Sequence, residues 1–256
     1  MIRKPIDRYD LKIKKSDYVV EFGPGHNPNY RSNVLVEKFI DSNYHRSSDI
    51  RMFPHQQYYH EDGTCTTFKD KEFDYSICIQ MIEHVDNPEA FLKEQMRIAK
   101  GGYLESPSII GELLFPKQSH KWVILEIDNK LVFFEKAKIT NRYNSNCGSL
   151  FLNYLPYLSL PYRMLKITEG DLFTNRYEWR DSIDFIVEPQ DEYYRAFIEK
   201  EWDMDMIQKL FPKHSVIKEL SNCIRALAHI LKTKLTPKRT PVLVSKDKIQ
   251  TVHIGE

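Results

Sequence analysis

Three acidic residues near the front of the chain lie where short apolar runs end. Glu21 directly precedes two glycines in VVEFGPGHNP, Glu37 ends VLVE, and Asp62 follows QYYHE. A carboxylate at the first of these positions would repel a pyrophosphate, and no Lys-Ser or Lys-Thr pair follows to form a phosphate-binding loop. Glu37 could accept both hydroxyls of a ribose, and Asp62 could accept a hydrogen bond from the exocyclic amine of a base. Together the three acids favour a nucleoside that carries positive charge rather than phosphates.

The two glycines of this turn, Gly23 and Gly25, lack side chains. The backbone can therefore take unusual angles there and approach a ligand closely. A plain turn between two elements is the alternative explanation, and the neighbouring acids favour the ligand-binding loop.

Five segments in the first half have the composition of buried strands, and a helix lies between the last two. The strands are expected at residues 17–22, 34–37, 57–62, 73–80 and 101–106. In the helical stretch NPEAFLKEQMRIAKGG, Asn87 suits the N-cap, Pro88 the first helical position and Gly101 the stop. This alternation predicts an α/β fold, with a mostly parallel central sheet and helices on both faces. In such a sheet, ligands bind beyond the carboxyl ends of the strands.

The second half predicts antiparallel and helical additions to this sheet. Residues 120–136 resemble a hairpin that turns at Asp128-Asn129, and residues 176–189 suggest a second antiparallel pair. Residues 215–235 have long helical periodicity, and their basic residues favour a solvated face, with a membrane surface or an acidic partner as the alternatives. We expect three segments: a cofactor-binding core over 1–140, added strands and helices with a substrate lid over 141–236, and a loose basic tail over 237–256.

The stretches VVEFGPG, LVE and HEDGTCTTFKDKEFDYSICIQMIEHVDNPEAFLKEQMRIAKGGYLESPS resemble the class I S-adenosylmethionine-dependent methyltransferases. The resemblance is closest to the type 11 group, which has an FD, EHV and GG signature, and it covers Tyr18 to Ser108. It implies a Rossmann-like methyltransferase fold with S-adenosyl-L-methionine as the cofactor. The cofactor-binding residues that it implies are Glu21, Phe22, Gly23 and Gly25 for the aminoacyl end, Glu37 for the ribose diol, Asp62 and Gly63 for the adenine, and Gln80 and Met81 beside the methyl-transfer site.

This sequence departs from the family pattern at two places. Asn27, followed by Pro28, replaces the third glycine of the loop, although Asn tolerates left-handed backbone angles. The spacing between Gly25 and Glu37 is also short for a crossover helix. Either the first helix is stunted, or Asp41 rather than Glu37 is the acid that binds the ribose.

Two histidines are candidates for a general base. His84 lies in the IEHV turn, and His120 follows the fifth predicted strand in QSHKWV. Histidine suits this role because its pKa lies near neutrality. The ordinary alternatives are a loop-stabilising hydrogen bond for His84 and a surface position for His120.

The composition excludes several classes of protein. The 37 basic and 36 acidic residues leave a net charge of +1, so no global field attracts nucleic acid. The cysteines Cys65, Cys78, Cys147 and Cys223 form no CxxC pair, which predicts reduced thiols and no zinc site. No long apolar run predicts a membrane span, and we expect a cytoplasmic protein.

The sequence therefore favours a methyltransferase that acts on a small or medium acceptor, with the hydroxyl of a sugar, lipid or similar metabolite as the first choice. The absence of a basic stripe argues against nucleic acid as the acceptor. A non-catalytic scaffold and a nucleotide-dependent oxidoreductase are the alternatives, and the acid before the glycines disfavours the latter. Oligomeric state is not predicted by these residues.

Overall fold

The computed structural model describes residues 5, 8, 10–44, 46–114, 116–139, 155–200, 202–237 and 239–251. The chain divides into two units: residues 1–106, 176–183 and 239–256 form unit 1, and residues 107–175 and 184–238 form unit 2. These units divide the chain at other positions than the three predicted segments, because residues 176–183 and 239–256 return to unit 1. Cys147 lies outside the described residues.

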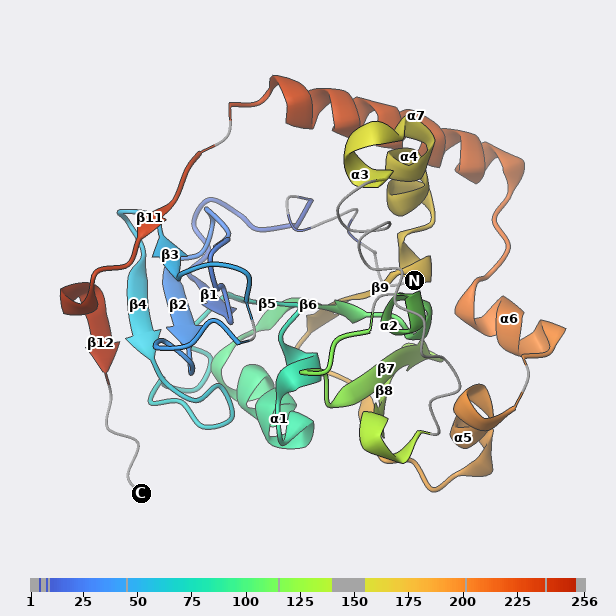
Figure 1. The fold of residues 1–256 in the computed structure, drawn as a ribbon, viewed down its shortest axis with the longest axis horizontal. Helices are drawn as coiled ribbons and strands as arrows, with labels where there is room; N and C mark the ends of the chain where they lie inside the picture. The colour runs from blue at the N-terminus through green and yellow to red at the C-terminus, as the bar shows by residue number, and fades with distance from the viewer. Residues whose placement is uncertain are drawn as a thin grey trace. The chain divides into compact units, whose positions relative to one another are not determined.

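The described residues of unit 1 form a seven-stranded sheet in the order β12-β4-β2-β1-β5-β6-β9 (Figure 1). Its strands are β1 (Val19–Phe22), β2 (Val34–Glu37), β4 (Gln57–His60), β5 (Tyr75–Ile79), β6 (Gly101–Pro107), β9 (Thr174–Arg180) and β12 (Ile249–Thr251). Every pair from β12 to β6 is parallel. The prediction of a mostly parallel α/β sheet is confirmed, and each of the five predicted strands is present.

The strands are buried because parallel sheets are covered on both faces. In β1, all four residues are buried, and β5 is buried over its first four. Leu11 and Ile13, from the segment before β1, pack against Val19 and Tyr103. Near β4 the cover comes from loops and from the C-terminal segment, including Ile40, Val244 and Ile249.

Helix α1 (Pro88–Ile98) connects β5 to β6 and follows the predicted capping. The side chain of Asn87 accepts a hydrogen bond from the N–H of Ala90, and Pro88 takes the first helical position. The predicted stop at Gly101 is wrong: the helix ends at Ile98, and Gly101 begins β6. A Cβ at Gly101 would lie 2.8 Å from the backbone oxygen of Trp179, so this glycine allows β9 to approach β6.

The other crossovers of unit 1 are loops in the described residues. Residues 23–33 join β1 to β2 without a helix, as do residues 38–50 on the way to β3 (Arg51–Met52). The first helix, which was predicted to be stunted, is therefore absent between β1 and β2. Fewer α-helices cover this sheet than predicted: among the described residues of unit 1, α1 is the single α-helix.

The segment predicted to be a loose tail instead pairs with unit 1 at two places. Strand β11 (Val242–Leu243) pairs antiparallel with β3, and β12 pairs parallel with β4. The guanidinium of Arg239 lies 3.7 Å from the centroid of the Tyr30 ring. The β12 pairing extends the large sheet beyond β4, whereas β11 and β3 form a separate two-stranded sheet.

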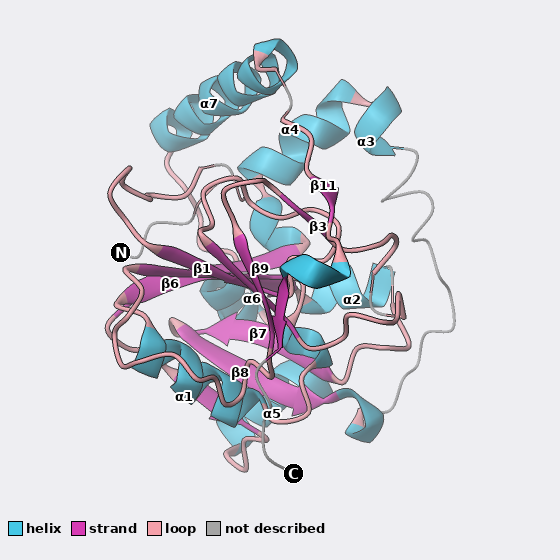
Figure 2. Cartoon of the chain, turned by 90° about the vertical axis from the view of Figure 1, so that its left-hand side faces the viewer, coloured by secondary structure: helices cyan, strands magenta, loops and turns pink. Residues whose placement is uncertain are grey.

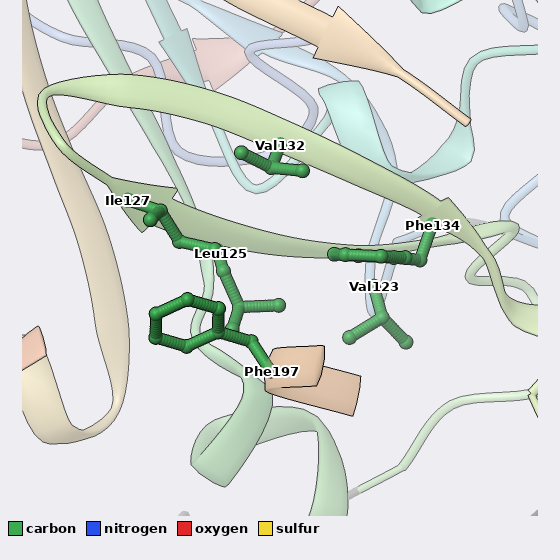
Figure 3. Packing of buried hydrophobic residues seen from close by; sticks show 6 residues of the cluster. All are labelled: Val123, Leu125, Ile127, Val132, Phe134 and Phe197. Carbon is green, nitrogen blue, oxygen red and sulfur yellow. The ribbon is translucent and has the colours of Figure 1, made fainter. Parts of the chain in front are cut away.

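Unit 2 is built around a hairpin of β7 (Trp122–Ile127) and β8 (Lys130–Glu135), as predicted. Asp128 and Asn129 form its turn with φ angles of 51° and 60°, the left-handed values that two-residue hairpin turns require. Side chains from one face of the hairpin pack against Phe197 of α5 (Glu192–Glu199), as Figure 3 shows.

The predicted second antiparallel pair over residues 176–189 is wrong. Strand β9 lies in the large sheet, whereas β10 (Phe185–Val187) pairs parallel with β8. The two strands therefore belong to different sheets. Gly101 and Gly102 of β6 allow β9 to approach, whereas β10 pairs with the edge of β8 that β7 does not occupy.

The remaining helices of unit 2 surround this hairpin or pack on one another (Figure 2). They are α2 (Ile109–Leu114), α3 (Leu155–Leu158), α4 (Leu160–Thr168), α6 (Met204–Leu210) and α7 (Val216–Leu235). The predicted helix over 215–235 is confirmed as α7, with the side chain of Ser215 capping the N–H of Lys218. Among the described helices, none is both long and apolar enough to cross a membrane.

Candidate functional site

The glycine turn after β1 adopts the backbone angles that only glycine tolerates well. Gly23 and Gly25 have φ angles of 61° and 53°, both in the left-handed region. A Cβ at Gly23 would lie 2.5 Å from the Cγ of Met81, whereas one at Gly25 would lie 3.6 Å from the nearest atom of Arg46. Gly23 therefore leaves the space that Met81 needs at the end of the neighbouring strand.

Glu21 is buried beneath this turn and holds the chain that follows it. Its carboxylate accepts hydrogen bonds from the N–H of Asn29 at 2.7 Å and the hydroxyl of Ser32 at 2.7 Å, and it pairs with Arg8 at 3.1 Å. Burial raises the pKa of Glu21, and these three partners oppose that rise. The side chain thus organises residues 27–32, which replace the missing crossover helix, and its partners are protein groups rather than an open pocket.

Two further residues of this segment make contacts within the protein. Asn27 is not among the residues with positive φ, and its carbonyl accepts a hydrogen bond from Arg8 at 2.6 Å. The ring of Phe22 packs edge-on against Phe91 at 5.6 Å, so this side chain belongs to the core between β1 and α1.

Glu37 lies at the end of β2 beside the glycine turn. Its carboxylate accepts hydrogen bonds from backbone N–H groups, including the N–H of Gly25. Burial raises the pKa of Glu37, and these hydrogen bonds and the charge of Arg46 oppose that rise. The side chain of Glu37 is 12% exposed, whereas that of Asp41 is 80% exposed and lies 3.9 Å from Lys246. Glu37 rather than Asp41 is therefore the acid next to the glycine turn.

Asp62 follows β4, which is the next strand beyond β2. One carboxylate oxygen pairs with Lys38 at 2.6 Å, and the other accepts from the N–H and hydroxyl of Thr64. Burial raises the pKa of Asp62, but the hydrogen bonds from Lys38 and Thr64 outweigh it and hold the pKa below its ordinary value. Asp62 thus places a carboxylate at the end of β4, with Lys38 and Thr64 as its partners. Gly63 leaves room for Phe22 and Phe91, because a Cβ there would lie 2.8 Å from the Phe91 ring.

Gln80 and Met81 follow β5 on the other side of β1. Gln80 has a φ of 53°, a strained value for a residue with a side chain, and such strain is concentrated at functional sites. Its N–H donates to the carbonyl of Glu105 at 2.8 Å, which fixes the chain as it leaves the strand. Met81 then lies over Gly23 and 4.0 Å from the sulfur of Cys78.

His84 lies in the short 3-10 helix η1 (Ile82–His84), and its N–H donates to the carbonyl of Met81 at 3.0 Å. The buried Glu83 places a carboxylate oxygen within 4.8 Å of a ring nitrogen of His84. A carboxylate at this distance can influence the orientation of the imidazole.

His120 belongs to unit 2, where it is buried. Its Nδ1 lies 2.5 Å from a carboxylate oxygen of Glu112, whose other oxygen lies 2.5 Å from the ammonium of Lys136. Burial raises the pKa of Glu112, but the hydrogen bonds from His120 and Lys136 outweigh it and hold the pKa below its ordinary value. The surface position that we weighed for His120 is therefore wrong.

Within unit 1, the carboxyl ends of four adjacent parallel strands bring the predicted residues to one edge of the sheet. Direct contacts join Gly23 to Met81 and Gly25 to Glu37. The sequence analysis missed Arg8 and Arg46, which support Glu21 and the loop after Glu37. Only the positive charge of these two arginines could have suggested that they pair with the acids. Both arginines lie in loops, where the sequence has no periodic spacing that predicts a contact.

Comparison with known proteins identifies the class to which this edge belongs. Residues 35–104 match a family model described as a methyltransferase domain. That range contains Glu37, Asp62, Gln80 and Met81, so the predicted resemblance is confirmed for this part of the chain. Residues 35–104 are therefore similar to a methyltransferase domain, for which S-adenosyl-L-methionine is the cofactor.

Solved structures that align with part of this chain include S-adenosylmethionine-dependent methyltransferases from Thermotoga maritima and Methanosarcina mazei. They are 24% and 18% identical, cover 37% and 38% of this chain and 45% and 54% of their own, and both have TM-scores of 0.27. The YcgJ protein of Bacillus subtilis is 14% identical over 43% of this chain and 56% of its own, with a TM-score of 0.32. This chain therefore spans only about half the length of these proteins. No curated protein matches the sequence.

The residues present fit this cofactor at three places. Gly23 gives the turn a left-handed backbone angle beside Met81, Glu37 offers a shielded carboxylate for a diol, and Asp62 offers a carboxylate that Lys38 and Thr64 already engage. Glu21 fits the predicted aminoacyl contact less well, since Arg8, Asn29 and Ser32 already engage it.

Proposed function

We propose that this protein transfers a methyl group from S-adenosyl-L-methionine to a small or medium acceptor, with a hydroxyl as the receiving group. The observation that carries the proposal is the gathering of Gly23, Glu37, Asp62 and Met81 at the carboxyl edge of four adjacent parallel strands. We assign the ribose to Glu37, the adenine to Asp62 and the neighbourhood of the methyl group to Gln80 and Met81.

The bound cofactor would supply an electrophilic sulfonium methyl group. The protein then has to align the acceptor for in-line attack and exclude water. A rigid chain at the end of β5 suits this task, because the Gln80 N–H is fixed on Glu105 and Met81 is held against Gly23.

A hydroxyl acceptor benefits from a base that removes its proton. We assign this role first to His84, which follows Met81 by one turn and has the Glu83 carboxylate within 4.8 Å. His120 is the second candidate, because the contact of its Nδ1 with Glu112 fixes which ring nitrogen faces away from that acid. Acceptor recognition falls to residues outside the matched range 35–104, and sugars and lipids are the acceptor classes to test.

Calorimetric titration with S-adenosylmethionine, its demethylated product and NAD tests the cofactor. We expect binding of the first two and none of NAD. Glu37→Gln should weaken binding by about 1.5–3 kcal/mol, which is roughly a 10- to 150-fold loss, because a charged hydrogen-bond acceptor is removed. Asp41→Asn is the matched control, and its affinity should stay within about twofold because its carboxylate is exposed. Equal losses in both variants would contradict the assignment of the ribose.

Transfer of labelled methyl groups to panels of sugars, nucleotide sugars and lipids tests the acceptor. In an active panel, His84→Asn should lower turnover by about 100-fold or more while cofactor affinity is preserved. His120→Asn provides the comparison, with circular dichroism as a check on folding. Full turnover in the His84 variant would assign the base to another residue, and NAD binding in place of S-adenosylmethionine would overturn the proposal as a whole.

A further inference from the structure

Helix α7 uses only one narrow face to pack within unit 2. Its buried residues are Ala226 and Ile230, and it packs on α4. Both views of the chain show α4 beside α7, with α3 next to α4 (Figures 1 and 2). The helix is 20 residues long, so it extends about 30 Å.

The face of α7 turned away from its packing contacts is apolar along its whole length. We call it the α7 stripe, and it consists of seven aliphatic residues that are between 42% and 82% exposed: Val216, Ile217, Leu220, Ile224, Leu227, Leu231 and Leu235. At 100° per residue, their positions fall within an arc of about 100°. A surface helix normally turns such a stripe toward the core, and here the stripe faces away from it.

Basic residues border the stripe. Lys218, Arg225 and Lys232 follow one another along one side, and Lys234 lies at the other edge near the C-terminal end. Glu219 is the acidic residue of the helix, so its formal charge is four positive minus one negative, or +3. An apolar face with flanking lysines and arginines is the pattern of a helix that lies in the plane of an anionic membrane surface.

Helix α3 carries two further exposed side chains, one aromatic and one aliphatic. Tyr157 and Leu158 are 77% and 67% exposed, and α3 packs on α4. Tyrosine is enriched at the boundary between lipid headgroups and acyl chains, because its ring is apolar and its hydroxyl is polar.

We propose that the α7 stripe docks this protein on a membrane surface that contains anionic phospholipids, with α7 lying parallel to that surface. The charge argues for this occupant over a second copy of the chain. Two stripes placed face to face would bring the lysines and arginines of both helices together, and like charges across an interface disfavour association. An anionic surface instead neutralises these groups while it buries the aliphatic side chains. The inference rests on unit 2 alone and does not depend on the proposed function.

Flotation of the full chain with vesicles tests this proposal. One set contains phosphatidylcholine with phosphatidylglycerol in equal parts, and the other contains phosphatidylcholine alone. We expect flotation with the anionic set, weaker binding to the neutral set, and loss of the difference at high salt.

A matched pair of variants separates the apolar contribution from the charge. Ile224→Asp and Ser221→Asp both place a carboxylate at an exposed position on α7, but only the first removes an aliphatic side chain. The added charge should weaken binding about fivefold in both, and Ile224→Asp should lose at least a further tenfold. Circular dichroism confirms that both variants keep their helices.

The proposal is overturned if the folded wild-type chain fails to float with anionic vesicles at low salt, or if the two variants lose equal affinity. Sedimentation velocity provides a further test. A wild-type dimer that becomes monomeric on Ile224→Asp, without vesicle binding, would assign the α7 stripe to a second copy and would likewise overturn it. Because methyl transfer is not measured in these experiments, their outcome is separate from that of the proposed function.

Discussion

Replacing Gly23 with alanine tests the link between the glycine turn and the end of β5. The φ of 61° places any residue with a Cβ in the left-handed region, at a cost of about 1–2 kcal/mol. The new Cβ would also lie 2.5 Å from Met81 Cγ and 3.0 Å from Met81 Cβ. These atoms are close to the Met81 backbone, so they cannot move away by rotation of the side-chain tip alone, and overpacking adds about 1–3 kcal/mol. We therefore expect Gly23→Ala to reduce the free energy of unfolding by about 2–5 kcal/mol.

Gly25→Ala is the matched control, because it introduces the backbone strain without the clash. Its φ is 53°, and the nearest atom to its new Cβ is 3.6 Å away. The expected loss is about 1–2 kcal/mol, from the left-handed backbone angle alone. Urea denaturation followed by circular dichroism measures both values.

The double variant Gly23→Ala/Met81→Ala completes the test. Removing the Met81 side chain beyond Cβ should relieve part of the clash, so the two changes should cost less together than the sum of their separate costs. Additive effects, or equal losses for Gly23→Ala and Gly25→Ala, would refute the inference that Gly23 is required by contact with Met81.

Two further predictions concern unit 2. Burial raises the pKa of Glu112, but hydrogen bonds from His120 and Lys136 outweigh this effect and hold the pKa below its ordinary value of 4.5. The ionised carboxylate therefore stabilises the fold above pH 4.5. This contribution is lost as the pH falls through the folded-state pKa. Glu112→Gln should flatten that part of the curve of stability against pH, and an unchanged curve would argue against the pairing. In the hairpin turn, Asn129 has a φ of 60°. In urea denaturation, Asn129→Gly should stabilise unit 2 by up to about 1 kcal/mol, and Asn129→Val should destabilise it by about 1–2 kcal/mol. The reverse order of stabilities would refute the left-handed conformation of Asn129.

Local sequence signals predicted the elements whose stability is local. The capping of α1 by Asn87 and the turn at Asp128-Asn129 depend on residues within a few positions of one another, and the structure confirms both. The five parallel strands were likewise predictable, because burial on both faces requires continuous apolar runs. The order of strand-end residues then indicated the candidate site.

Long-range contacts defeated the same reasoning at other places. Gly101 was predicted both to stop the helix and to begin a strand; only the strand start is present, where β9 approaches it closely. Strands β9 and β10 resemble a hairpin in sequence, yet each pairs with a partner far from it in the chain. The spacing of residues within a segment contains no information about such partners.

By itself, the sequence determined the parallel sheet, the glycine turn, the acids that follow its strands and the amphipathic character of α7. Only the tertiary structure decided that Glu21 engages Arg8 and the loop after it, that Glu37 rather than Asp41 lies beside Gly25, and that the apolar stripe of α7 faces away from its own unit. The physical reason is that periodicity specifies which residues share a face, whereas the direction of that face and the partner of a buried charge depend on segments that are distant in the chain.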